Sequence, residues 1–459
     1  MTAALEVDLV AIGAGQAATP LVLALAEQGM KVVLIERAAL GGSCVNYGCT
    51  PTKAVLASAR AARRADDREL GVTVADIRVD YRAVIDRAAG FARQGREHLE
   101  SLFTGDNPRL VRGHARLCGR AGDRLRVQVD GGPSFLASNV VLDTGSRSTM
   151  PPIDGLQTVP VVSAETWLDL AVLPEHLLII GSGSVGLEMA QFYRRLGGRV
   201  TVVEKNSEVT PGEDADIGGR LREALAAEGI AFHTGVTIDR VEPCEGGGMA
   251  TIAGERVHFS HVFVASGRTP ALADLGLDTV GLSPEPDGTL HVDGSLRTRA
   301  RGVFAAGDIR GGLRFTHTAW DDHRILLSVL GDGPPHTTRR VTPYVTFTDP
   351  ELARFGLSET QARKAGIAHH VHCQDYSAIA RARQDGRARG VIKLVLDDTR
   401  ERLLGAAILG EAAGELIHLL ALVMQLDQPL SVIVDGVYAH PTLAEGLQSA
   451  VIVAVKSSN

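Results

Sequence analysis

VDLVAIGAGQAA, residues 7–18, is the stretch of sequence that decides the fold of this chain. The run Val7–Ile12 is apolar except for Asp8, which predicts a strand buried on both faces. The glycine-rich turn Gly13–Ala18 follows it, and an apolar helical pattern continues to Gln28. A second apolar strand is predicted over Val32–Ile35, and it ends at Glu36. The stretch therefore predicts a strand–turn–helix–strand unit in which an acid closes the second strand.

The same plan returns later in the chain. Leu177–Ile180 is another apolar strand, GSGSVG spans residues 181–186, and Val200–Val203 runs into Glu204. In both copies 23 positions separate the first glycine from the acid. Glycines let the backbone approach a pyrophosphate at a helix N-terminus, and the acid accepts hydrogen bonds from a ribose. Ala18 stands where a third glycine is usual, a position that accepts alanine. The repeat predicts two dinucleotide sites, most economically one for a flavin and one for a nicotinamide.

Composition limits the classes of protein that fit. The 459 residues are enough for about three domains. A content of 45% hydrophobic and 22% charged residues excludes a disordered chain, and a net charge of −7 argues against nucleic-acid binding. The longest apolar stretch, 416–426, is too short to span a bilayer. Glu6 and Asp8 stand where a secretory leader would be apolar, so we expect a cytoplasmic protein with no membrane partner.

A pair of cysteines follows the first unit, within GGSCVNYGCTPTK at residues 41–53. Cys44 and Cys49 do not have a zinc-ligand spacing and no second pair completes a site, so no metal is predicted. On a regular helix their Cα atoms would lie roughly 8–9 Å apart, beyond the limit of about 7 Å for a disulfide. A bridge therefore requires irregular backbone, for which Gly48 supplies the freedom, and such a strained bridge is of the reducible kind. The other cysteines have no partner at a useful spacing: Cys118, Cys244 and Cys373. The Arg-rich stretch 60–68 is predicted to be a solvated helix face.

The segment GGSCVNYGCTPTK resembles the redox-disulfide signature of the class I pyridine nucleotide–disulfide oxidoreductases. Other motifs of that family follow in the same order along nearly the whole chain. TGS at 144–146 resembles the flavin-contacting turn, and GVFAAGD at 302–308 resembles the strand whose aspartate binds the flavin. ASGRTP at 265–270 resembles the loop that closes the nicotinamide domain, and HPTLAE at 440–445 resembles the catalytic His–Glu segment.

The resemblance implies roles for individual residues. Cys49 is the sulfur on the flavin side, and Cys44 is the interchange thiol that meets the substrate. His440 is the general acid–base, and Glu445 orients it. Lys53 and Glu188 form an ion pair near the flavin. The implied FAD-binding residues are Gly13, Gly15, Glu36, Gly42, Ser43, Lys53, Ala115, Thr144, Gly145, Ser146 and Asp308, and the implied NAD-binding residues are Gly181, Gly183, Gly186, Glu204 and Gly267.

The fold class implied is α/β, with two Rossmann-like dinucleotide-binding domains, for FAD and NAD(P), and a C-terminal α+β dimerisation domain. The expected boundaries are 1–152, completed by 273–340, for the FAD-binding domain, 153–272 for the NAD(P)-binding domain and 341–459 for the dimerisation domain. The last part has apolar strands over 390–396 and 403–409 and an apolar helix over 415–426. In the family each chain supplies its histidine to the partner's disulfide, so we expect an obligate homodimer with shared active sites.

The activity implied is transfer of electrons from NADH through FAD to a Cys44–Cys49 disulfide and on to a small thiol or disulfide substrate. Glu204 favours NADH over NADPH because a carboxylate repels a 2′-phosphate, although Arg199 and Lys205 add positive charge nearby. One alternative is a reductase of the same fold for mercuric ion, hypothiocyanite or reactive chlorine, because FTHTAWDDHRIL at 315–326 resembles that branch. Against mercuric ion, no cysteine follows Cys373 and the histidine is retained. An alternative of another class is a flavoprotein with mainly a binding or assembly role, against which the complete Cys–Cys–His–Glu set argues.

Overall fold

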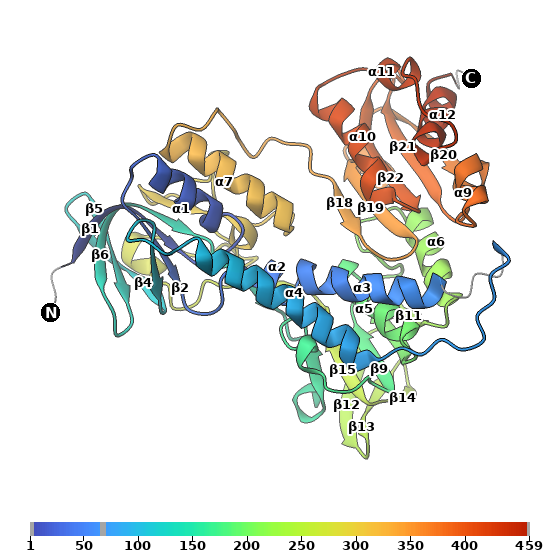
Figure 1. Cartoon of the computed structure of the whole chain (residues 1–459), viewed down its shortest axis with the longest axis horizontal. Coiled ribbons are helices and arrows are strands. Elements are labelled where there is room, and N and C mark those ends of the chain that lie inside the picture. Colours follow the sequence, from blue (N-terminus) through green and yellow to red (C-terminus); the bar gives the residue numbers. More distant parts are fainter. Residues whose placement is uncertain (1–3, 65–69, 457–459) are drawn as a thin grey trace.

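The computed structural model describes residues 4–64 and 70–456 of the chain. The chain forms three main parts, each with its own sheet and helices, and it returns to the first part after the second, so the predicted α/β class is confirmed (Figure 1). None of the helices in the described ranges combines the length and apolarity needed to cross a membrane. The expected domain boundaries stay a prediction.

The first part is a parallel sheet extended by an antiparallel meander. Its strand order is β3-β2-β1-β6-β5-β4, and β17 pairs in parallel with residues 140–142 of β6, on the edge away from β1 and beyond the end of β5. The apolar run at the N-terminus becomes a central strand, as its hydrophobicity predicts. The elements are β1 (Leu5–Ile12), α1 (Ala18–Glu27), β2 (Val32–Glu36), α2 (Gly42–Asn46), α3 (Cys49–Arg64), α4 (Tyr81–Ser101), β3 (Arg109–Arg112), β4 (Ala115–Ala121), β5 (Arg124–Val129), β6 (Ser134–Leu142), β7 (Ser146–Ser148), β17 (Val303–Ala305) and α7 (Thr316–Leu330).

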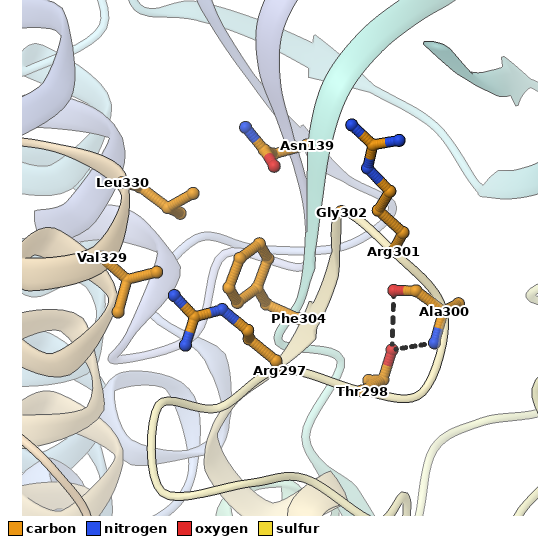
Figure 2. A pocket seen from close by; sticks show the side chains of 9 residues that line it. All are labelled: Asn139, Arg297, Thr298, Ala300, Arg301, Gly302, Phe304, Val329 and Leu330. Atoms are coloured by element: carbon orange, nitrogen blue, oxygen red, sulfur yellow. Dashed lines mark hydrogen bonds between the residues drawn. The ribbon is translucent and has the colours of Figure 1, made fainter. Parts of the chain in front are cut away.

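A hollow of about 380 Å³ lies on the outside of this part, where β17 and the preceding loop face the end of α7 (Figure 2). Arg297, Arg301 and Asn139 contribute its polar groups, and Phe304 with Val329 contributes its apolar wall. None of the residues implied in catalysis or cofactor binding lines it.

The second part repeats the parallel arrangement in the order β11-β10-β9-β15-β8. A small antiparallel sheet, β12-β13-β14, is appended to it, and β16 pairs with β7 of the first part. The elements are β8 (Val161–Ser163), β9 (His176–Ile180), α5 (Ser184–Arg195), β10 (Arg199–Glu204), α6 (Ala215–Ala226), β11 (Ala231–Thr234), β12 (Ile238–Cys244), β13 (Gly247–Ile252), β14 (Glu255–Phe259), β15 (His261–Val264) and β16 (Arg268–Pro270).

The third part is an antiparallel sheet in the order β18-β19-β22-β21-β20, covered by helices. The two apolar strands and the apolar helix expected here are present as β21, β22 and α10. The elements are β18 (Tyr344–Thr346), β19 (Glu351–Gly356), α8 (Glu359–Lys364), β20 (His369–Asp375), α9 (Ala380–Gln384), β21 (Val391–Asp397), β22 (Leu403–Gly410), α10 (Ala413–Gln425), α11 (Ser431–Val434) and α12 (Leu443–Lys456).

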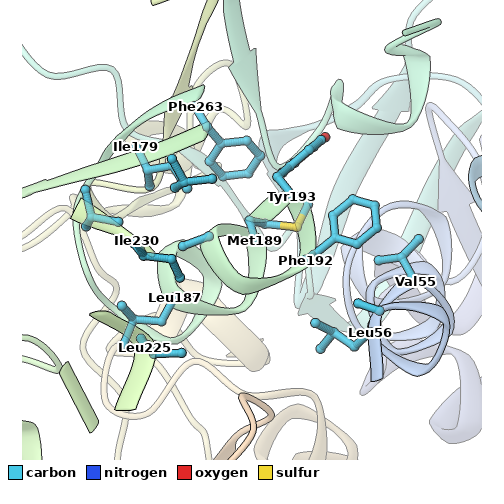
Figure 3. Packing of buried hydrophobic residues seen from close by; sticks show 14 of the residues in the cluster. Val55, Leu56, Ile179, Leu187, Met189, Phe192, Tyr193, Leu225, Ile230 and Phe263 are labelled. Carbon is cyan, nitrogen blue, oxygen red and sulfur yellow. The ribbon is translucent and has the colours of Figure 1, made fainter. Parts of the chain in front are cut away.

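The helix that begins at the second cysteine packs onto the second part. Val55 and Leu56 of α3 lie in one buried cluster with Phe192 and Tyr193 of α5, which in turn covers the sheet through residues such as Leu187 (Figure 3). Burial of large apolar side chains stabilises such a contact by about 1.5–3 kcal/mol each. The cysteine segment is therefore fixed against the second part as well as the first.

The prediction of a solvated Arg-rich face on α3 holds in part: Arg63 and Arg64 are exposed, but Arg60 and Arg64 also form ion pairs. The Arg60 guanidinium donates to Glu351 Oε1 at 2.8 Å and to the Thr348 carbonyl at 3.3 Å. Arg64 pairs with Glu411 at 2.7 Å. Both partners belong to the third part, so this helix joins all three parts. Arg68, at the end of the stretch, lies outside the described residues.

Candidate active site

One large cavity of about 1400 Å³ lies where the three parts meet. The turns of the first sheet, the cysteine segment, the start of α7, the residues before β18 and one face of α10 all contribute to its wall. The implied residues that line it are Gly13, Gly15, Glu36, Gly42, Ser43, Cys44, Cys49, Lys53, Ala115, Thr144, Gly145, Ser146, Glu188 and Asp308. The NAD-binding set and the His440–Glu445 pair do not line it.

The two glycine-turn units each contain the same hydrogen bond, which sequence reasoning missed. The Glu36 carboxylate accepts from the Ala14 amide at 2.8 Å, and the Glu204 carboxylate accepts from the Ser182 amide at 2.9 Å. In each copy the closing acid thus holds the residue after the first glycine. The repeat extends to the next strand of each sheet, because a Cβ on Gly13 would lie 2.3 Å from the Asp143 carbonyl and one on Gly181 would lie 2.5 Å from the Ala265 carbonyl.

Asp143 is the main residue of the site that the sequence did not single out. Its carboxylate accepts from the amides of Ala17 and Ala18 at 3.1 and 2.8 Å, at the start of α1. A Cβ on Gly15 would meet this carboxylate at 2.6 Å, so the glycine is required for packing against Asp143. Burial raises the pKa of Asp143 to about 8, the two amides oppose this rise, and the Asp322 and Asp308 charges add to it. A search for acids immediately before the TGS turn could have found it.

The residues present fit a flavin nucleotide. Gly145 has a φ of +68°, which favours glycine, and nothing lies within 4 Å of a Cβ built there, although it lines the cavity. Each oxygen of Glu36 accepts one backbone hydrogen bond, which leaves lone pairs for a ribose diol. Ser146 Oγ donates to Asp308, and Arg268 donates to Ser146 Oγ at 2.7 Å, so these side chains are held at the wall. The cavity thus offers a glycine turn, a ribose acceptor and an ordered polar wall.

In the second glycine-turn unit, different glycines border open space. Nothing lies within 4 Å of a Cβ built on Gly183 or on Gly267, whereas Gly186 packs against Gly181. Glu204, however, accepts four hydrogen bonds, two from Ser182 and two from Asn206, at 2.5–2.9 Å. Four bonds use the acceptor capacity of a carboxylate. Glu204 therefore acts here through its charge and through the shape of the turn.

The two cysteines lie on either side of a helix break. Cys44 is in α2 and Cys49 begins α3, with Tyr47 at a φ of −151° between them. The expectation of irregular backbone is met, but the reason given for Gly48 is wrong, because its φ is not in the left-handed region. A Cβ at Gly48 would lie 2.8 Å from the Ser43 carbonyl, and its amide donates to that carbonyl at 2.7 Å. Glycine is needed for this close approach.

The two sulfurs have opposite electrostatic environments. The hydrogen bond with Cys44 lowers the pKa of Cys49 to about 6; burial opposes this, and the Thr316 hydroxyl and Lys53 charge add to it. The same hydrogen bond, together with burial, raises the pKa of Cys44. Thr316 Oγ1 lies 3.1 Å from Cys49 Sγ at the first residue of α7, a contact that sequence reasoning missed. A reduced pair would hold its negative charge on Cys49 and its proton on Cys44.

Lys53 and Glu188 are brought together at the cavity wall. Lys53 Nζ lies 2.7 Å from Glu188 Oε2, and it also lies 4.5 Å from the centre of the Phe347 ring. The Phe347 amide donates to Glu188 Oε1 at 2.9 Å, so the buried carboxylate has a partner on each oxygen. One turn of α3 separates Cys49 from Lys53, which places the ammonium beside the thiolate.

His440 and Glu445 form a pair far from these cysteines in the same chain. His440 Nδ1 lies 2.9 Å from Glu445 Oε2, just before and within the first turn of α12. The carboxylate binds the Nδ1 side of the ring, which leaves Nε2 as the free nitrogen. The His440 side chain is 70% exposed. A single chain therefore presents the His440 ring to its surroundings.

Comparison with known proteins agrees with this geometry. Residues 7–322 match the family described as pyridine nucleotide-disulphide oxidoreductase, and residues 342–451 match the dimerisation domain of that family. The match to a dimerisation domain indicates that the third part forms the homodimer. The related enzymes act on small-molecule substrates.

The relatives cover nearly the whole chain. A dihydrolipoyl dehydrogenase of Chlorobaculum tepidum is 32% identical over 99% of this chain and 98% of its own length. A mercuric reductase of Streptomyces lividans is 34% identical, over 96% of this chain and 95% of its own length. The structure of the HOCl-induced flavoprotein disulfide reductase RclA of Escherichia coli has a TM-score of 0.87 at 31% identity and covers 97% of this chain and 99% of that chain. The chain belongs to the pyridine nucleotide-disulphide oxidoreductase family and is an FAD-dependent oxidoreductase that uses NAD(H).

Proposed function

We propose that this enzyme reduces a small disulfide with electrons from NADH, and that Cys44 and Cys49 are its working dithiol. The observation that carries the proposal is the asymmetry of the two sulfurs: Lys53 and Thr316 stabilise a thiolate on Cys49, while Cys44 holds a proton. Bound FAD supplies the transfer of two electrons from NADH to the Cys44–Cys49 disulfide. The roles of all other residues concern binding, orientation and proton movement.

The flavin would lie in the 1400 Å³ cavity. Gly13, Gly42 and Ser43 would hold its phosphates at the start of α1, and Glu36 would accept from the ribose. Asp308 and Ser146, ordered by Arg268, would hold the chain between the ribose position and the cysteines. The nicotinamide nucleotide would bind at Gly183 and Gly267, on the side of Lys53 and Glu188.

Cys44 carries out the exchange with substrate. Its thiol loses a proton to a base, and the thiolate attacks one sulfur of the substrate disulfide, which forms a mixed disulfide and releases one substrate thiolate. That thiolate takes the proton back from the base. The Cys49 thiolate then attacks Cys44 Sγ, so that the Cys44–Cys49 disulfide forms and the second substrate thiolate leaves. Each cycle consumes one NADH and one proton and yields two thiols.

The base we propose is the partner subunit's His440. Because the bond to Cys49 and burial raise the pKa of Cys44, its thiol needs an acid–base group, and the His440–Glu445 pair of its own chain does not line the cavity that contains it. Glu445 holds His440 so that Nε2 points outward. Large apolar side chains of the same part are exposed, with Leu422 at 56% and Leu426 at 58%, as expected of an unpaired interface face.

The domain boundaries 1–152 with 273–340, 153–272 and 341–459 and a cytoplasmic location are part of this proposal. Reducing compartments keep a dithiol of this kind available for turnover. Mercuric ion is not the substrate we propose, because the chain retains the histidine implied in disulfide exchange, His440.

Reduction of the holoenzyme with one equivalent of NADH tests the assignment of the sulfurs. We expect a long-wavelength absorbance from a thiolate beside the oxidised flavin, which appears in the wild type on reduction, is already present without NADH in Cys44→Ser, where no disulfide can form, and is absent from Cys49→Ser. Cys118→Ser, an exposed cysteine of β4, is the matched control. Loss of the absorbance in Cys44→Ser but not in Cys49→Ser would reverse the assignment, and its absence from the wild type would contradict the proposed dithiol.

A further inference from the structure

One face of α7 lines the large cavity, and two of its side chains, Trp320 and Arg324, have no role in the chemistry above. Thr316, Trp320 and Arg324 all line this cavity. They are spaced four residues apart, which places them along one face of the helix. With a rise of 1.5 Å per residue, Trp320 lies roughly 6 Å and Arg324 roughly 12 Å along the axis from Thr316. Thr316 touches Cys49 and its hydroxyl also lowers the pKa of Cys44, while Trp320 and Arg324 are each 48% exposed, so the stripe runs from both sulfurs toward solvent.

The stripe carries surplus positive charge. Asp321 is shared by Arg324 at 3.0 Å, His336 at 3.0 Å and Arg340. Asp322 binds Arg310 at 2.7 Å and Arg340 at 2.8 Å. Two carboxylates therefore hold three guanidinium groups, and one positive charge is left even with the imidazole neutral.

Arg324 and Arg340 both line the cavity, and Arg324 is the more exposed of the two. Arg310 and Arg340 are buried by their partners, at 12% and 10% side-chain exposure, whereas the Arg324 side chain is 48% exposed. Glu415 and His418 also line the cavity, but they belong to α10, whereas Arg324 lies on the stripe of α7 that begins at Thr316.

Trp320 provides an apolar surface between the sulfurs and Arg324. Its side chain is 48% exposed, although tryptophan is among the residues that most favour burial, and the His323 ring packs edge-on to it with the centres 4.6 Å apart. A large exposed aromatic side chain that lines a cavity is typical of a binding site. An apolar segment of a substrate would pack on this ring.

We propose that the substrate of this site is a disulfide with an acidic group at the end of an apolar arm, bound by Arg324 with the arm on Trp320. The proposal rests on the proposed function, because it takes Cys44 and Cys49 as the reacting dithiol. A guanidinium binds a carboxylate through charge-assisted hydrogen bonds, which the corresponding neutral amide does not match. The acidic form of a substrate should therefore bind about tenfold more tightly than its amide.

Lipoic acid and lipoamide are matched probes, since they share the same disulfide ring and apolar arm and differ by one charge. Calorimetric titration of the oxidised holoenzyme gives both dissociation constants without turnover. We expect lipoic acid to bind about tenfold more tightly to the wild type, and Arg324→Gln to remove this preference. Arg339→Gln, which removes the same charge at an exposed position outside the cavity wall, should keep it. Trp320→Ala should weaken both ligands, and size-exclusion chromatography with light scattering should show it as a dimer.

Equal binding of the two probes by the wild type, or a preference that survives Arg324→Gln, would overturn the proposal. A Trp320→Ala chain that loses the dimer would show that this ring belongs to the subunit contact and would overturn the part assigned to it. If lipoic acid binds selectively but supports no NADH oxidation and no other disulfide does, the proposed function fails while the subsite stands.

Discussion

The buried carboxyl of Asp143 makes the free energy of unfolding of the protein depend on pH, and this dependence can be measured. Its pKa of about 8 arises chiefly from burial. An unfolded chain releases this proton near pH 4, so between about pH 4 and pH 8 the native state binds more protons, and the free energy of unfolding falls as pH rises. The slope is about 1.4 kcal/mol per pH unit, or about 3 kcal/mol between pH 5 and pH 7. Asp143→Asn keeps an acceptor for the Ala17 and Ala18 amides but does not titrate, so it should lack this slope.

Thermal unfolding of the holoenzyme at intervals from pH 5 to pH 8 measures the effect. The melting temperature of Asp143→Asn should equal that of the wild type near pH 5 and exceed it increasingly as pH rises. Asp123→Asn, at an exposed turn of the same sheet, is the control and should follow the wild type. A constant difference between Asp143→Asn and the wild type at every pH would refute a buried, proton-holding carboxyl. Asp143→Ala should be less stable than Asp143→Asn at every pH, because it leaves two helix amides without an acceptor.

Three further outcomes follow from the site. The long-wavelength absorbance of the reduced holoenzyme should be lost as pH falls through about 6, where Cys49 gains a proton. Thr316→Val should move this transition to higher pH, because it removes a hydrogen-bond donor 3.1 Å from Cys49 Sγ. A transition that does not move would contradict the role of Thr316. Lys53→Met should slow reduction of the dithiol by NADH at least tenfold in stopped-flow experiments, since it leaves Glu188 buried and unpaired, and an unchanged rate would exclude the pair from the electron path. Steady-state kinetics should show a higher kcat/KM for NADH than for NADPH, and a clear NADPH preference would contradict the charge argument at Glu204.

Local patterns predicted the framework of this molecule. The apolar run before Gly13, the glycine turn and the acid at a fixed distance define β1, α1 and β2, and their repeat defines β9, α5 and β10. These signals are readable because they depend on residues close together in the chain. The cysteine motif was likewise found from one short segment, and the break between α2 and α3 was expected from the geometry of a disulfide.

Features that depend on distant segments were not predictable. Asp143 meets the start of α1 from more than a hundred positions away, and Thr316 reaches Cys49 across 267 positions. The Arg60 side chain looked solvated because a helical pattern says nothing about a third sheet that packs against it. Gly48 was correctly seen as necessary, but only the structure shows that a carbonyl contact is the reason.

The central claim is that the dithiol of one subunit works with the histidine of the other, and subunit complementation tests it most directly. Cys44→Ser and His440→Ala homodimers should each be inactive in NADH-dependent disulfide reduction. After random exchange about half of the dimers are mixed, and each mixed dimer has one intact site, so about a quarter of the wild-type activity should return. Native mass spectrometry verifies the exchange. Activity that stays absent in a verified mixture would show that His440 does not serve the partner's cysteines.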